Sequence, residues 1–189
     1  MKQNSIPVLT SARIRLRPFV ASDAIDVQKY AGDRDIAYNT TNIPHPYKKG
    51  MAISWIETHL QEYNEGRGIV FAIEHRDPVY FIGAIGLHAM LNEHHRAELG
   101  FWIGKPFWGN GFCTEAARTL IAFAFQTLKL NRIVAYHFSR NPASGRVLQK
   151  LNMRHEGTFR QHMKKWGIFV NVEAYGILRN EFIPSKIVK

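Results

Sequence analysis

The sequence predicts a single α/β (α+β) domain in which a mixed, mostly antiparallel central sheet is flanked by helices. Strand-like and helix-like segments alternate along the 189 residues, which favours helices packed on a sheet. A hydrophobic content of 46% is enough for one sizeable core. No apolar run approaches the ~20 residues of a membrane-spanning helix, so no membrane association is expected.

The first third of the chain predicts a strand, two helices and a loop. Residues 12–19 alternate polar and apolar side chains with the two-residue period of a strand. Ser22 or Asp23 is placed to cap a helix that runs to about Ala31. Residues 39–50 contain two prolines and a glycine and are expected to form a loop. Apolar side chains then recur at helical spacing over residues 53–63.

Two helices in the second half have clear start signals. The central helix opens with Thr114 and Glu115 and carries an apolar stripe as far as Leu128. The next helix has Asn141 as its N-cap and Pro142 at its first position. The remaining strands are expected at residues 69–74, 79–90, 97–103, 132–138, 153–163 and 168–178, with the fourth of these buried on both faces.

Charge and cysteine content limit the expected partners and compartment. The single cysteine, Cys113, excludes an internal disulfide framework, and we expect a cytoplasmic protein without a signal peptide. The chain has 25 Lys and Arg against 15 Asp and Glu, and the net charge of +10 attracts polyanions such as coenzyme A or nucleic acid. The basic residues are scattered, so a solvated surface is the first interpretation of this charge and a ribosome- or nucleic-acid-facing surface the second.

The most informative segment is residues 97–118, AELGFWIGKPFWGNGFCTEAAR, where a strand passes through a glycine-rich turn into a helix. Gly109 and Gly111 let backbone approach a ligand, and the helix N-terminus offers unpaired N–H groups to an anion such as phosphate. An ordinary tight turn is the alternative. The glycine spacing fits neither a P-loop nor the dinucleotide-binding fingerprint.

The run WGNGFCTEA after ELGFWIG resembles the diphosphate-binding segment of the GNAT superfamily of acyl-CoA-dependent N-acyltransferases. The likeness is to the branch that contains bacterial ribosomal-protein N-terminal acetyltransferases. It covers roughly residues 11–182, the extent of the expected acetyltransferase domain. Further segments match that branch in the expected order, at residues 11–19, 43–47, 81–87, 141–157 and 173–182.

The resemblance implies acetyl-CoA as cosubstrate and a set of residues that bind it. In this superfamily, backbone groups of the strand before the glycine-rich turn, which splays from its neighbour, bind the pantetheine amides. Asn141 contacts the cofactor in related enzymes, with plain helix capping as the alternative. The expected diphosphate cradle is Trp108, Gly109, Asn110, Gly111, Phe112, Cys113 and Thr114, and the expected strand residues are Phe101, Trp102 and Ile103.

Acyl transfer from a thioester to an amine also needs a proton acceptor for the amine. Glu98 is the only carboxylate inside the strand that leads to the glycine-rich turn, so it is the candidate general base, directly or through water. A salt bridge from Glu98 to a cation such as Arg96 is the alternative. Glu93 and Glu173 are weaker candidates for the base.

The departing thiolate benefits from a proton source. Ser144, which is also expected to contact the cofactor, stands where related enzymes place a hydroxyl near the sulfur, and it is the favoured acid. Tyr136 is the rival hydroxyl. Cys113 as a nucleophile would need an activating base, and no metal is expected, because adjacent His94 and His95 have no Cys or acidic partner at a ligand spacing.

The expected activity is therefore acetyl transfer to a primary amine by direct attack in a ternary complex. The expected acceptor is a protein N-terminus, with a ribosomal protein as a candidate partner, and a polyamine, amino sugar or drug is the alternative. A non-catalytic CoA-sensing or RNA-associated module is the alternative from another class. The protein is expected to be a monomer or homodimer, and acceptor specificity is expected from residues 36–50, 88–96 and 160–170.

Overall fold

The computed structural model describes residues 5–183. The strands are β1 (Leu9–Thr10), β2 (Ile14–Arg17), β3 (Ile69–Arg76), β4 (Val79–Leu91), β5 (Arg96–Ile103), β6 (Arg132–Phe138), β7 (Arg154–Lys165) and β8 (Ile168–Leu178). The helices are α1 (Ala24–Ala31), α2 (Arg34–Asn39), α3 (Met51–Asn64), α4 (Phe112–Gln126) and α5 (Pro142–Lys150), with short 3-10 turns at Ala21–Asp23, Asn92–His94, Lys105–Phe107 and Arg179–Glu181.

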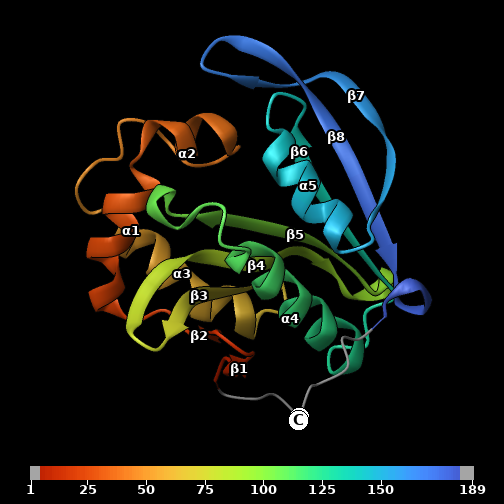
Figure 1. Cartoon of the computed structure of the whole chain (residues 1–189), viewed down its shortest axis with the longest axis horizontal. Helices are drawn as coiled ribbons and strands as arrows, with labels where there is room; N and C mark the ends of the chain where they lie inside the picture. The colour runs from red at the N-terminus through yellow and green to blue at the C-terminus, as the bar shows by residue number, and fades with distance from the viewer. Residues whose placement is uncertain (1–4, 184–189) are drawn as a thin grey trace.

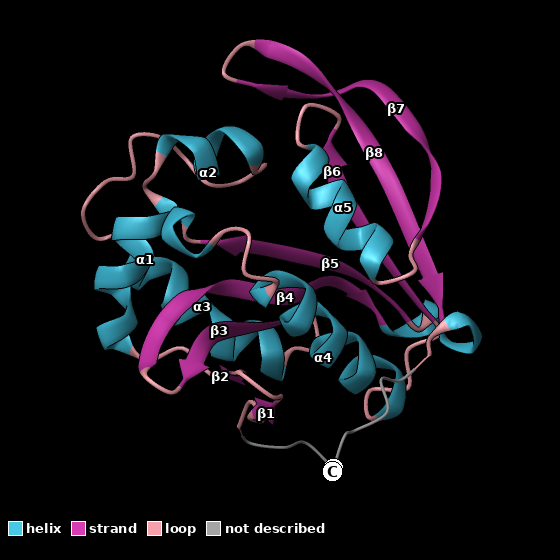
Figure 2. Cartoon of the chain, viewed as in Figure 1, coloured by secondary structure: helices cyan, strands magenta, loops and turns pink. Residues whose placement is uncertain are grey.

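The strands form one mixed sheet in the order β1–β2–β3–β4–β5–β6–β8–β7 (Figures 1 and 2). Only the β5–β6 pair is parallel, and α4 is the crossover helix between these two strands. All other neighbouring strands run antiparallel. The predicted mixed, mostly antiparallel sheet flanked by helices is therefore confirmed.

Successive side chains along the strands point to opposite faces of the sheet and pack into two apolar layers, one on each face. On one face, α4 buries Leu120 and Ile121 against strand residues such as Phe71. On the other face, α1 and α3 pack around Ala72 and Phe81. The alternation of Phe71 and Ala72 between these two layers is the two-residue period of a strand, and it fixes the register of β3.

Two sequence-based expectations were wrong in detail, and one helix was not predicted. The central helix begins at Phe112 rather than at Thr114, because Gly111 takes a left-handed conformation (φ +78°) that lets the helix start directly after it. Helix α2 (Arg34–Asn39) lies in a stretch for which no element was predicted, and the Asp33 carboxylate starts it by accepting a hydrogen bond from the Asp35 N–H at 2.7 Å. Strand β6 is not buried on both faces, because Tyr136 is 37% exposed.

The parallel strands β5 and β6 pair over only half of their length. Their register runs from Arg96–Arg132 to Leu99–Ala135, and no pairing is present beyond that point in the described chain. Both strands continue past the last pair, and they diverge there (Figure 1). The end of β5 therefore keeps backbone N–H and C=O groups on its β6 side that no neighbouring strand satisfies.

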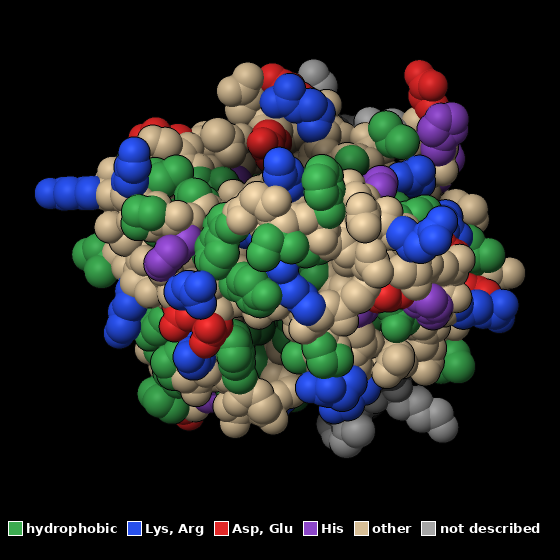
Figure 3. Space-filling view, turned by 90° about the horizontal axis from the view of Figure 1, so that it is seen from above, with side chains coloured by type: hydrophobic (Ala, Val, Ile, Leu, Met, Phe, Trp, Pro, Cys, Tyr) green, Lys and Arg blue, Asp and Glu red, His purple; other side chains and the backbone are tan. Residues whose placement is uncertain are grey.

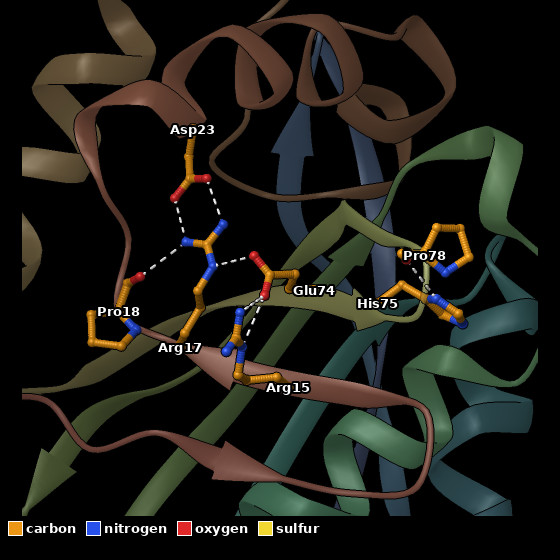
Figure 4. A network of polar contacts seen from close by, with 7 residues as sticks. All are labelled: Arg15, Arg17, Pro18, Asp23, Glu74, His75 and Pro78. Carbon is orange, nitrogen blue, oxygen red and sulfur yellow. Dashed lines mark hydrogen bonds and ion pairs between the residues drawn. The ribbon is translucent and has the colours of Figure 1, made fainter.

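Four charged side chains join the edge of the sheet to the turn before α1 (Figure 4). Glu74 on β3, which is 6% exposed, accepts hydrogen bonds from Arg15 Nε at 2.9 Å and Arg17 Nε at 2.6 Å. The Arg17 guanidinium also donates to both carboxylate oxygens of Asp23 at 2.7 Å. Asp23 was expected to cap α1 and instead holds the turn before it, where it accepts from the Val20 N–H at 2.9 Å.

We predict that Glu74→Gln lowers the free energy of unfolding by about 2–4 kcal/mol, because it leaves partly buried Arg17 and half-exposed Arg15 without the carboxylate that both share. Urea denaturation measures the change. Glu57→Gln removes an exposed carboxylate from α3 and is the matched control, with an expected effect within ~0.5 kcal/mol. Equal stability of the two variants would contradict the structural role given to Glu74.

Candidate functional site

Two cavities meet at the gap between β5 and β6. The first cavity, about 540 Å³, lies between the glycine-rich turn, the start of α4 and the start of α5. The second cavity, about 720 Å³, lies against β4, β5 and β6 and under the chain that links α2 to α3. Phe101, Trp102 and Ser144 line both cavities, so two molecules bound in them would meet beside these residues.

The glycine-rich turn is held open by its own polar groups. Trp108 Nε1 donates to the Ile103 carbonyl at 2.7 Å, and the Asn110 side-chain amide donates to the carbonyls of Phe107 and Trp108 at 3.2 and 3.1 Å. At Gly111 an added Cβ would meet only Arg13 Nη2, at 3.6 Å. Open space therefore borders the N-terminus of α4, where the first N–H groups of a helix have no partner within it.

The structure brings together nearly all of the residues that the sequence assigned to cofactor binding. Asn110 is the exception, because it does not line the first cavity and its side chain is used inside the turn. The residues that do line the first cavity are Phe101, Trp102, Ile103, Trp108, Gly109, Gly111, Phe112, Cys113, Thr114, Asn141 and Ser144. Their role in binding stays a prediction.

Two side chains in the first turns of α4, Glu115 and Cys113, have structural surroundings that leave them little chemical role. The Glu115 carboxylate accepts from the backbone N–H and Nε of Arg13, both at 2.8 Å, and from Ser11 Oγ at 2.8 Å, so it fastens the chain before β2 to α4. Burial raises the pKa of the Cys113 thiol. A thiol kept protonated is a poor nucleophile, which supports the expectation that Cys113 does not attack the substrate.

Asn141 and Ser144 form a small capping unit at the start of α5. Asn141 Oδ1 accepts from the Ser144 N–H at 3.3 Å, as predicted for an N-cap. Asn141 Nδ2 donates to Ser144 Oγ at 3.0 Å, so the hydroxyl keeps its own proton for another acceptor. Tyr136, the rival hydroxyl, lines the second cavity only. Ser144 is thus the one of the two that borders both cavities.

Glu98 lies in the wall of the second cavity, across from His88 on β4. Burial raises the pKa of its carboxyl, and the charge of Arg96 opposes this shift. The expected alternative, a salt bridge to Arg96, is not present: within the described residues no ion pair joins Glu98 to a cation. Glu98 therefore faces the cavity without a fixed partner.

The two weaker candidates for the base lie elsewhere. Glu93 is exposed in the turn before β5, outside both cavity walls. Glu173 accepts hydrogen bonds from Ser139 Oγ at 2.5 Å and Thr158 Oγ1 at 2.7 Å and pairs with His155 Nε2 at 2.7 Å, which lowers its pKa to about 2. A carboxylate held in this way is a weak base.

Sequence reasoning missed a clasp beside the second cavity, whose wall includes Thr41 and Ile43. We define this clasp as the contacts of Lys165 and Trp166, at the tip of the β7–β8 hairpin, with α2 and the segment after it. Lys165, which is 7% exposed, donates to the carbonyls of Thr41 and Ile43 at 3.2 and 2.8 Å. The Trp166 ring lies 5.6 Å from that of Tyr38. Figure 1 shows the hairpin tip reaching towards α2.

Arg140 lies beneath this clasp and borders the first cavity. Its guanidinium stacks 3.7 Å above the Tyr38 ring and donates to the Tyr38 carbonyl at 2.6 Å. No sequence signal pointed to Arg140 or Lys165, because their partners are a ring and backbone carbonyls more than 100 residues away along the chain. The clasp joins segments 36–50 and 160–170, both of which were expected to determine acceptor specificity.

Lys and Arg side chains are spread over the upper face of the molecule and do not gather in one patch (Figure 3). This distribution fits the interpretation of a solvated basic surface. Within residues 5–183, no group of three His, Cys, Asp or Glu is arranged to hold a metal ion. Across the same residues, no helix combines the length and apolarity needed to cross a bilayer.

Comparison with known proteins places this geometry in a sequence family. The model of the acetyltransferase (GNAT) domain matches residues 13–154. YoaA, an uncharacterized N-acetyltransferase of Bacillus subtilis, is 35% identical over 175 residues, which cover 92% of this chain and 97% of YoaA. The [ribosomal protein uS5]-alanine N-acetyltransferase of Escherichia coli is 26% identical over 102 residues, which cover 53% of each chain.

The fold is shared with solved structures. The crystal structure of an acetyltransferase of the GNAT family from Bacillus anthracis superimposes with a TM-score of 0.83 at 23% sequence identity. The superposition covers 93% of this chain and all of the other. Nearly the whole architecture described above is therefore common to both proteins.

Proposed function

The chain belongs to the acetyltransferase (GNAT) domain family, and on that premise we propose that it acetylates the N-terminal amine of a protein with acetyl-CoA as donor. The observation that carries the proposal is the meeting of two cavities at Ser144 and the end of β5. One cavity has the features of an anion site, and the other contains a carboxylate without a fixed partner. Donor and amine bound in these cavities would meet directly in a ternary complex.

The residues of the first cavity fit acetyl-CoA. The open N-terminus of α4 offers the N–H groups of residues 111–114 to the diphosphate, and the positive end of the helix dipole favours its charge. The end of β5 at residues 101–103 has no β6 partner, and its free backbone edge receives the pantetheine amides as an added strand would. When bound, acetyl-CoA supplies an acetyl thioester, and the protein's main contribution is to hold it beside the amine.

The side chains at the gap supply the proton transfers. The amine nitrogen forms a bond to the acetyl carbon, and its proton passes to Glu98, directly or through one water. Since burial raises the pKa of Glu98, the ionised carboxylate is a stronger base than an exposed one. Ser144 donates its hydroxyl proton to the sulfur as the carbon–sulfur bond breaks, and the serine oxygen regains a proton from water. The presence of both groups at the gap argues against a non-catalytic CoA-sensing or RNA-associated module.

Two observations support a protein N-terminus as the acceptor. The E. coli relative is named for acetylating an alanine of a ribosomal protein. The second cavity, at about 720 Å³, is large enough for several residues of an extended peptide.

We also propose a cytoplasmic location, which fits the single, half-buried and unpaired cysteine.

The proposed function predicts that the protein binds acetyl-CoA and releases free CoA only when an amine acceptor is present. Direct attack requires both molecules to be bound, so thiol release without an amine stays at the background of thioester hydrolysis. Calorimetry measures the binding of acetyl-CoA. A thiol assay over a panel of N-terminal peptides and small amines measures the release of CoA. A flat titration at low salt would refute the function.

Gly111→Asp is expected to weaken acetyl-CoA binding by at least tenfold, because the new side chain and its charge enter the space where the diphosphate meets α4. Gly50→Asp is the matched control. Gly50 also precedes a helix with positive φ (+90°), and a Cβ added there would meet no atom within 4 Å, but it lines neither cavity. If calorimetry gave both variants the same affinity, the cradle would be wrongly placed.

Glu98→Gln is expected to reduce turnover at neutral pH by about 10²–10⁴-fold while leaving acetyl-CoA affinity within a few-fold. Part of the loss is recovered at high pH, where the free amine is already neutral and a base matters less. The pH–rate profile from pH 6 to 9 checks this, with Glu93→Gln as the control outside both cavities. Unchanged activity of Glu98→Gln across that range would mean that Glu98 is structural.

Ser144→Ala and Tyr136→Phe distinguish the two candidate acids. Each removes one hydroxyl, so stability is expected to change by about 1 kcal/mol or less. We expect turnover to fall in Ser144→Ala and to stay near the native value in Tyr136→Phe, because only Ser144 borders both cavities. Acetyl-CoA affinity is measured in parallel, since Ser144 shares the α5 cap with Asn141. The opposite pattern would assign the acid role to Tyr136.

A further inference from the structure

An arginine without a partner lies beside the candidate base in the second cavity. Arg96 and Glu98 both line this cavity and both belong to β5, two residues apart. Arg96 Nε is buried and has no hydrogen-bond partner. Among the side chains that the structure describes, none forms an ion pair with this guanidinium.

The other arginines of the sheet contrast with Arg96. Arg15 and Arg17 on β2 share Glu74, and Arg132, which is opposite Arg96 in the register, pairs with Glu156. Removing a charged guanidinium from water costs free energy, and a nearby anion offsets this cost. Arg96 is therefore available to an anion that enters the cavity.

The second cavity has few charged groups. In the described chain Glu98 is the only acidic residue that lines it, and Arg96 is the only lysine or arginine. A polyamine would bring several positive charges into this wall and would meet Arg96. An acceptor with one amine and one nearby anionic group would instead have a partner for each charge.

The spacing on β5 matches such an acceptor. Side chains two residues apart point to the same face of a strand and are separated by roughly 6.5–7 Å. An extended peptide has the same rise per residue, so an amine next to Glu98 leaves the side chain of the second residue near Arg96. The two charged groups of β5 therefore define both the position of the amine and the direction of the peptide.

Resting on the proposed function, we propose that Arg96 determines acceptor specificity by binding a carboxylate at the second position of the acceptor peptide while Glu98 receives its amine. The class of acceptor is then a protein with an acidic N-terminal sequence. The net charge of +10 agrees with this class, because a positive field increases the encounter rate of an acidic partner.

The test compares three synthetic peptides that differ only at the second residue, which is Glu, Gln or Lys. We expect kcat/KM of the native protein to be about tenfold or more higher for the Glu peptide than for the Gln peptide, and lowest for the Lys peptide. Most of the difference is expected in KM. In Arg96→Gln the preference between Glu and Gln disappears, and in Arg96→Lys it is partly kept.

Arg67→Gln is the matched control, because it removes the same charge from an exposed site outside both cavities. It is expected to keep the native preference, which separates a local contact from the effect of net charge. Since each variant is compared with itself across peptides, a general loss of activity or stability leaves the ratios interpretable. If Arg96→Gln does not fold, the Arg96→Lys variant still tests whether the preference for the Glu peptide is weakened.

Equal kcat/KM for the three peptides in the native protein would overturn the inference, as would a preference that survives in Arg96→Gln. If small amines are acetylated and none of the peptides is, the inference and the choice of a peptide acceptor are wrong, but the acetyltransferase mechanism stands. If no amine at all promotes CoA release, the proposed function fails as well.

Discussion

The divergence of β5 from β6 after the Leu99–Ala135 pair is the constraint on which the site depends. Backbone groups that a continuous sheet would satisfy are left without a strand partner at the end of β5. The two cavities meet at that gap, and Ser144 borders both of them. A fully paired β5 and β6 would have closed this gap.

The elements around the gap are fixed by different kinds of interaction. The buried carboxylates of Glu74 and Asp23 hold β2, β3 and the turn before α1 together, away from the cavities. Arg140, which lines the first cavity, and Lys165 instead bind backbone carbonyls of α2 and of the segment after it. The scaffold is thus joined by paired charges, whereas the clasp is joined by hydrogen bonds to backbone carbonyls, which do not depend on the side chains of the residues that accept them.

Local patterns in the sequence were enough to predict most of the fold and the glycine-rich turn. The alternation in β3, β4 and β5 and the Asn141–Pro142 start of α5 depend on residues close together in the chain, so they could be read directly. Helix α2 was missed because it is only six residues long and has little helical periodicity. The unpaired state of Arg96 could not be predicted either, since it depends on which acidic side chains lie nearby in three dimensions.

A crystal structure of the protein with bound coenzyme A tests the two-cavity arrangement most directly. We expect the diphosphate at the N–H groups of residues 111–114, the pantetheine along the unpaired edge of Phe101–Ile103, and the thiol beside Ser144. The second cavity would then open onto the thiol from the side of Glu98. Coenzyme A bound outside the gap between β5 and β6, or with its thiol turned away from Ser144, would contradict this arrangement.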